Sequence, residues 1–168
     1  MLKREKANRK DARTALEIRN AAILNQCIGH YSMEILKDWT SGGLSDEFMD
    51  AVEANCYVAI EDKQIVGTGM VNIETGKIDA IFVHPDHMRK GIGKKIIAFL
   101  EGMALTRGLE TLALQSTLNA AAFYRACGFA GNKVDTYTTS RGVSLDCIPM
   151  TKTIAQGAAA AVAKKRRG

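Results

Sequence analysis

The sequence predicts a single α/β domain in which helices flank a mixed β-sheet. Three observations support this: the length of 168 residues, the composition, and the order of the helical and strand-like segments. One domain usually takes about 100 to 200 residues, and strands that alternate with helices are typical of α/β folds. Apolar residues make up 46% and charged residues 24% of the chain, as in folded soluble proteins, so the chain is expected to fold.

Three helices are predicted near the N-terminus. Residues 10–26 carry apolar side chains at helical spacing, namely Ala12, Ala15, Leu16, Ile18, Ala22 and Ile23. A second, short helix covers residues 33–39 and stops before the glycine pair at 42–43. A third covers residues 45–54, where Ser45 suits the N-cap position.

The pattern then changes to strands. Residues 56–60 and 65–71 are rich in β-formers and are separated by the polar turn 61–64, which predicts a β-hairpin. A third strand covers residues 78–83. Pro85 ends it, because proline has no amide hydrogen to continue a ladder.

The second half predicts two further helices and three strands. Residues 92–103 form the most regular amphipathic helix of the chain. A buried strand follows at 111–115, and then a helix capped by Asn119 that runs to Cys127. Two strands near 133–139 and 143–151 complete the sheet.

A tail of different composition follows the predicted domain, residues 1–154. Residues 155–168 are rich in alanine and end in Lys164, Lys165, Arg166 and Arg167, and we expect them to be disordered or a frayed helix. These four side chains supply most of the net charge, 23 − 18 = +5, so the domain itself is nearly neutral. A folded face that binds nucleic acid usually carries spread basic charge, so nucleic acid is not the expected partner.

The cysteines predict no disulfide framework and no metal site. Cys27, Cys56, Cys127 and Cys147 lie far apart, without a CxxC pair or a zinc-like spacing with histidine. No stretch of about 18 apolar residues and no leader-like apolar segment is present. We therefore expect free thiols and a cytoplasmic protein without a membrane partner.

One segment, IFVHPDHMRKGIGKK, predicts an anion site. Glycine lets the backbone approach a ligand closely, and the first amides of the helix that follows have no helical acceptor. The helix dipole and the side chains Arg89, Lys90, Lys94 and Lys95 add positive potential there. The segment lacks a P-loop, GxxxxGK[ST], and Ile96 replaces the third glycine of a dinucleotide fingerprint, GxGxxG.

Two blocks in the chain resemble the GNAT superfamily of acetyl-CoA-dependent N-acetyltransferases. VHPDHMRKGIGKKII is similar to the family's motif A, Q/R-x-x-G-x-G/A, and STLNAAAFYRACGF is similar to its motif B. Weaker likeness covers about residues 3–152. Met88 stands where the family usually has glutamine or arginine, which weakens one side-chain contact but leaves the main-chain amides available.

The resemblance implies how acetyl-CoA would bind as co-substrate in a GNAT-like fold. The pantetheine arm would lie where the mixed sheet is splayed between strands 78–83 and 111–115. The acetyl carbonyl would accept a hydrogen bond from an amide near Val83. The implied cofactor-binding residues are Ile81, Phe82, Val83, Arg89, Lys90, Gly91, Ile92, Gly93, Lys94, Asn119 and Tyr124.

The resemblance also implies the catalytic groups. Tyr124 stands where the family places the general acid that protonates the departing thiolate. The strand carboxylate that serves many members as base is replaced by Lys77, and Asp79, two residues on, is our hypothesis for the base. Glu74, His84 or a water chain are the alternatives.

The acceptor would be a small-molecule or peptide amine that attacks acetyl-CoA directly in a ternary complex. His30 and Tyr31 lie where the family commonly builds its acceptor pocket, and they are candidate substrate contacts. Dimers are common in the family, which leaves a homodimer open. The rival readings are a non-catalytic acyl-CoA-binding sensor and a nucleic-acid binder that works through the basic tail.

Overall fold

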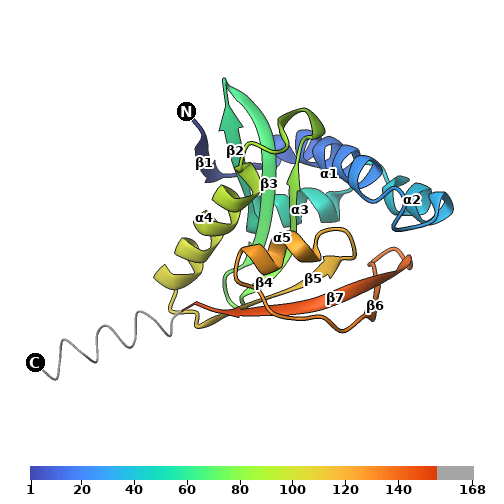
Figure 1. The fold of residues 1–168 in the computed structure, drawn as a ribbon. Coiled ribbons are helices and arrows are strands. Elements are labelled where there is room, and N and C mark those ends of the chain that lie inside the picture. Colours follow the sequence, from blue (N-terminus) through green and yellow to red (C-terminus); the bar gives the residue numbers. More distant parts are fainter. Residues whose placement is uncertain (155–168) are drawn as a thin grey trace, which may run out of the picture.

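Seven strands form one mixed sheet in the computed structural model, which describes residues 1–154 (Figure 1). Their order across the sheet is β1-β2-β3-β4-β5-β7-β6, and β4 and β5 are parallel whereas all other neighbours are antiparallel. The strands are β1 Lys3–Lys6, β2 Cys56–Glu61, β3 Gln64–Asn72, β4 Lys77–Val83, β5 Thr111–Thr117, β6 Asp135–Thr138 and β7 Ser144–Thr153. The predicted mixed α/β sheet is confirmed, whereas the tail at 155–168 lies outside the described residues.

The helices lie on both faces of the sheet (Figure 1). In β2, Val58 packs with α1 and α3, whereas the next residue, Ala59, packs with α4 and α5 on the opposite face. This alternation follows from the period of two residues in a strand. The helices are α1 Ala12–Gln26, α2 Met33–Thr40, α3 Asp46–Asn55, α4 Ile92–Thr106 and α5 Ala121–Ala126.

The predicted caps have different outcomes. Ser45 caps α3 as expected, because its Oγ accepts a hydrogen bond from the Phe48 amide at 3.1 Å. The expectation that Asn119 caps α5 is wrong. The N-cap position is Ala120, which makes no side-chain capping bond, and the Asn119 side-chain oxygen instead accepts a hydrogen bond from the thiol of Cys27, the C-cap residue of α1.

The edge strand β1 was not among the predicted elements. Its four residues, KREK, are mostly exposed and show no apolar alternation. They pair with β2 from Lys3 opposite Ile60 to Lys6 opposite Tyr57. Charged side chains are common on edge strands because they discourage pairing with other chains.

Two irregularities in β4 open the sheet. Met70 of β3 lies opposite Ala80, and Val71 lies opposite Ile78, so Asp79 is the extra residue of a β-bulge. The parallel ladder between β4 and β5 contains only two pairs, Lys77 with Ala113 and Ile78 with Leu114. Beyond Ile78 the two strands separate, which confirms the predicted splay of the sheet.

Candidate functional site

Two adjacent cavities lie where β4 and β5 separate. The larger, here called the basic groove, has a volume of about 730 Å³ and runs past the start of α4. The smaller, here called the aromatic cavity, has a volume of about 120 Å³ and lies between α1, α2 and the β6–β7 hairpin. Their walls share five residues: Gln26, Ile81, Asn119, Ala120 and Tyr124.

The basic groove is lined by the segment that the sequence predicts to bind an anion. Gly91, the N-cap residue of α4, has a φ of +76°, a conformation that glycine adopts without strain. The first helical main-chain bond runs from the Lys95 amide to the Gly91 carbonyl at 3.2 Å. The amides of Ile92, Gly93 and Lys94 therefore have no acceptor within the helix, and these residues line the groove.

Gly93 has a packing role beside the groove. A Cβ at this position would lie 3.0 Å from the Cζ atom of Phe123, whereas a Cβ at Gly91 would meet nothing within 4 Å. The absence of a side chain at Gly93 therefore lets α4 approach α5 closely. The two glycines of the motif serve different purposes: Gly91 allows the turn and Gly93 allows the helix contact.

The charge around the groove is positive. Arg89 and Lys94 line it, and no carboxylate in the described part of the chain forms an ion pair with either. Lys90, also predicted here, instead faces Glu61 at 3.9 Å, so its charge is partly balanced. His87 lies 3.3 Å from the same carboxylate and also lines the groove.

The predicted strand residues divide between the cavities. Ile81 and Val83 line the basic groove. Phe82 lies between them in sequence and lines the aromatic cavity, where it packs near Ile23 of α1 and Leu36 of α2. Met88 also lines the groove, and its sulfur accepts a hydrogen bond from the side-chain nitrogen Nε2 of Gln26 at 3.0 Å.

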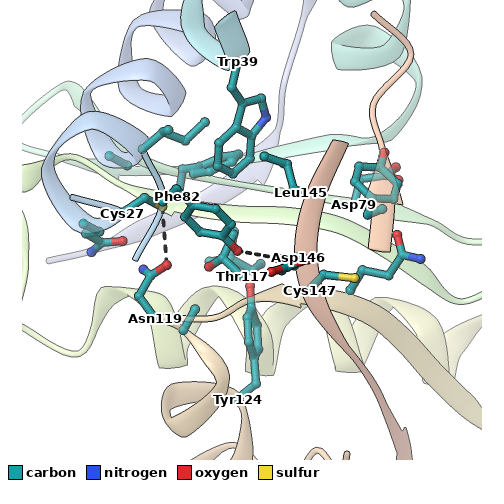
Figure 2. Close-up of a pocket in the computed structure, with 18 of the residues that line it drawn as sticks. Cys27, Trp39, Asp79, Phe82, Thr117, Asn119, Tyr124, Leu145, Asp146 and Cys147 are labelled. Carbon is teal, nitrogen blue, oxygen red and sulfur yellow. Dashed lines mark hydrogen bonds between the residues drawn. The ribbon is translucent and has the colours of Figure 1, made fainter. Parts of the chain in front are cut away.

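Tyr124 lies where the two cavities meet. Its side chain rises from α5 toward Thr117 in Figure 2, and only 7% of the residue is exposed. Its ring packs edge to face on Phe123 and Phe129, with centroids 5.2 and 5.9 Å away. Burial raises the pKa of the phenol above its ordinary value, so the hydroxyl keeps its proton at neutral pH.

Asp79 lines the aromatic cavity on a side away from Tyr124 in Figure 2. One carboxylate oxygen lies 3.9 Å from the Lys77 ammonium. Burial raises the pKa of Asp79, and Lys77 acts in the opposite direction with the smaller effect. The alternative bases, Glu74 and His84, line neither cavity.

The two candidate substrate contacts also separate. His30 lines the basic groove, whereas Tyr31 lines the aromatic cavity. The Tyr31 hydroxyl accepts a hydrogen bond from the Leu118 amide at 3.1 Å and donates one to the Asp146 carbonyl at 2.5 Å. Its hydrogen bonds are thus made with the main chain.

Several lining residues had no signal in the sequence. Trp39 packs against Tyr31, with ring centroids 6.1 Å apart, and also lines the aromatic cavity. Tyr137 joins the cavity from β6. Contacts between distant segments leave no local pattern, so neither residue could be assigned to a site from the sequence alone.

The thiols and the possible metal ligands are the remaining reactive side chains. Cys27 and Cys147 line the aromatic cavity, and all four cysteines are free. Burial raises the pKa of Cys27 to about 11. Within residues 1–154, no group of three histidine, cysteine or carboxylate side chains could hold a metal ion, and no helix is long and apolar enough to cross a bilayer.

The family model and the similar proteins of known sequence are all acetyltransferases by name. Residues 52–130 match the family model described as "Acetyltransferase (GNAT) domain". A Bacillus subtilis protein named "Putative acetyltransferase" is 30% identical over 84% of this chain and 89% of its own length. Streptothricin acetyltransferase of Escherichia coli is 32% identical over 61% of this chain and 59% of its own length.

Solved structures show the same fold. A GCN5-related N-acetyltransferase from Rhodopseudomonas palustris superposes with a TM-score of 0.79 at 25% identity, covering 91% of this chain and 94% of that one. PaiA N-acetyltransferase from Thermoplasma acidophilum, solved with coenzyme A, superposes with a TM-score of 0.70 at 18% identity, covering 91% and 99%.

Proposed function

Because the chain belongs to the GNAT family of acetyltransferases, we propose that it moves the acetyl group of acetyl-CoA to a primary amine in a ternary complex. The observation that carries this proposal is the junction of two cavities at Tyr124. One cavity has the free amides and positive charge that suit a diphosphate, and the other is a small site for a second reactant. The sequence prediction of an acyltransferase is confirmed by the family.

The basic groove would hold acetyl-CoA. The amides of Ile92, Gly93 and Lys94 would donate to the diphosphate, and the guanidinium of Arg89, which pairs with no carboxylate of residues 1–154, would add charge-assisted bonds. The edge of β4 beyond Ile78, which β5 leaves unpaired, would bond the pantetheine arm. Asn119, whose side-chain oxygen accepts a hydrogen bond from the Cys27 thiol, lines both cavities and would also contact the pantetheine arm.

The reaction would be a direct acyl transfer. The unprotonated amine attacks the thioester carbonyl, whose oxygen an amide near Val83 would polarise. A C–N bond forms and the C–S bond breaks. Tyr124, kept protonated by burial, would donate its proton to the departing thiolate.

Asp79 would receive the proton that the amine loses. Its position at the side of the aromatic cavity calls for a bridging water between the carboxylate and the amine. Its raised pKa makes it a better proton acceptor near neutral pH than an ordinary surface carboxylate. The bulge directs this side chain, because an extra residue shifts the alternation of β4.

A covalent cysteine route has less support. Cys27 and Cys147 line the aromatic cavity, but burial raises the pKa of both thiols, so little thiolate forms at neutral pH. A direct attack needs no such nucleophile. A cytoplasmic location and a homodimer stay predictions from the sequence.

Initial rates of coenzyme A release with both substrates varied test the proposal. A ternary complex predicts intersecting lines in double-reciprocal plots, and release that depends on the amine. Parallel lines would indicate a covalent acetyl-enzyme and contradict direct attack. Binding of acetyl-CoA without turnover of any amine would favour the sensor reading instead.

A further inference from the structure

The hydroxyl of Tyr31 takes the place of one main-chain bond in the β5–β7 ladder. The last paired residues of this ladder are Thr117 and Cys147. The next step would join the Leu118 amide to the Asp146 carbonyl, but both groups bond the Tyr31 hydroxyl instead, at 3.1 and 2.5 Å. A direct bond between a main-chain amide and a carbonyl spans only about 2.9 Å between nitrogen and oxygen. Tyr31 therefore acts as a spacer that joins the two strands and holds them apart at this point.

A second hydrogen bond joins the same parts of the chain. The thiol of Cys27 donates to the side-chain oxygen of Asn119 at 3.4 Å, as Figure 2 shows. Cys27 and Tyr31 lie in one tight turn, because the Cys27 carbonyl accepts a hydrogen bond from the Tyr31 amide at 3.2 Å. We call residues 27–31 the α1–α2 turn and residues 117–120 the β5–α5 turn. The first turn thus binds the second at two successive residues.

The β5–α5 turn leads directly into α5 and so determines where Tyr124 points. A hydrogen bond from the Ala120 amide to the Thr117 carbonyl closes the turn at 3.1 Å, and the Tyr124 amide bonds the Ala120 carbonyl at 3.1 Å. The N-cap residue, Ala120, has only a methyl group and cannot cap this six-residue helix. The hydrogen bonds of Tyr31 and Cys27 therefore supply a fixed starting point that α5 lacks by itself.

The position of Tyr124 must be accurate if it acts as a general acid. Its phenol lies where the two cavities meet, and Figure 2 shows its side chain pointing to Thr117 in the β5–α5 turn. A general acid must lie within about 2.6–3.2 Å of the atom that it protonates. A displacement of about 1 Å can cost about 100-fold in rate. A small shift of the β5–α5 turn is thus enough to slow proton transfer.

We propose that Tyr31 is a positioning residue: its hydroxyl, together with the Cys27 thiol, fixes the β5–α5 turn so that the Tyr124 phenol meets the sulfur of acetyl-CoA. This inference rests on the proposed transferase function. In that reaction the amine forms the C–N bond, the C–S bond breaks, and the Tyr124 proton passes to the sulfur. Tyr31 keeps its own proton in its bond to the Asp146 carbonyl. It therefore acts through Tyr124 and not by contact with the amine.

Three single variants separate this role from a general loss of packing. Tyr31→Phe removes both hydrogen bonds and keeps the ring that packs edge to face on Trp39. Tyr57→Phe is the matched control, because it also removes one phenol hydroxyl, but Tyr57 packs on Phe99 and lines neither cavity. Cys27→Ala removes the second hydrogen bond and tests the same turn if Tyr31→Phe folds poorly.

We expect Tyr31→Phe to slow single-turnover acetyl transfer by about 10- to 100-fold, with the Kd for acetyl-CoA within about threefold of the wild type. Cys27→Ala should act in the same direction, and Tyr57→Phe should keep the wild-type rate. The decisive variant combines Tyr31→Phe with Tyr124→Phe. Once the acid is absent, its position no longer matters, so the double variant should be slower than Tyr124→Phe by less than about threefold.

Two kinetic results would overturn the proposal. If the losses of the two single variants multiply in the double variant, Tyr31 has a role of its own, such as contact with the amine. If Tyr31→Phe and Cys27→Ala both keep the wild-type rate, the two hydrogen bonds do not position the acid.

Crystal structures of the wild type and of Tyr31→Phe, each with coenzyme A, separate this inference from the transferase function. A Tyr124 hydroxyl displaced by about 0.5 Å or more from the coenzyme A sulfur in the variant would support the positioning role. If that displacement is seen but no amine is turned over by the wild type, only the transferase function is refuted. Turnover of amines together with multiplied losses and an unmoved Tyr124 would refute the positioning role and leave the transferase function standing.

Discussion

Replacing Tyr124 with phenylalanine tests the chemical step. The change removes one hydroxyl and keeps the ring that packs on Phe123 and Phe129. A positioned general acid contributes about 10²- to 10⁴-fold to the rate, which corresponds to about 2.7–5.4 kcal/mol of activation free energy. Because the ring keeps its contacts, the affinity for acetyl-CoA should change little.

A single-turnover experiment measures acetyl transfer without a contribution from product release. Chromatography quantifies the coenzyme A formed, so the free thiols of the protein do not contribute to the signal. Tyr137→Phe is the matched control, because Tyr137 lines the same cavity and has no assigned proton to give. A Tyr124→Phe rate constant within about threefold of the wild type would refute the role of the phenol as acid.

The remaining predictions concern pH and stability. In the wild type, the acidic limb of the pH profile of kcat/KM should lie above the ordinary carboxyl pKa of about 4, because burial raises the pKa of Asp79. Asp79→Asn should remove this limb. An unchanged pH profile would exclude Asp79 as the base. Gly91→Ala should lower the free energy of unfolding, measured with urea, by about 1–2 kcal/mol, because φ at Gly91 is +76°. Gly102→Ala, inside α4, should raise it by about 0.5–1 kcal/mol. The opposite order of stability would contradict the left-handed conformation at Gly91 and the helical one at Gly102. The free energy of unfolding should fall as pH rises above 9.0. Burial raises the pKa of Cys27 to about 11 and that of Cys56 to about 12, so the unfolded state loses these thiol protons at a lower pH than the folded state. A Cys56→Ala variant whose stability falls equally steeply with pH would refute this cause.

Local patterns were enough to predict the scaffold of the groove. The helical spacing of Ile92, Ile96 and Ile97 placed α4, and Pro85 marked the end of the strand before it. Free amides at a helix start follow from backbone geometry alone. The free amides and the basic side chains of this helix start were therefore predictable without any knowledge of the remaining chain.

Features that depend on pairing between distant segments were not predictable in this way. The edge strand β1 carries only charged side chains and forms because β2 offers it a ladder. The bulge at Asp79 is defined by the register of β3 against β4. The Asn119 side chain bonds Cys27 across 92 positions, which outweighed the local tendency of asparagine to cap a helix.

The aromatic cavity shows the same limit. Tyr31, Trp39 and Tyr137 come from three separate segments, and each alone is consistent with an ordinary packed aromatic. Only the close approach of the hairpin to α2 makes them one site.

Titration of the protein with coenzyme A, followed by calorimetry and by the amide resonances of the start of α4, tests the central claim most directly. Saturable binding of one molecule per chain, with the largest shifts at Ile92, Gly93 and Lys94, is the predicted result. An absence of binding heat, or shifts confined to residues outside the basic groove, would contradict the claim that this helix start grips a diphosphate.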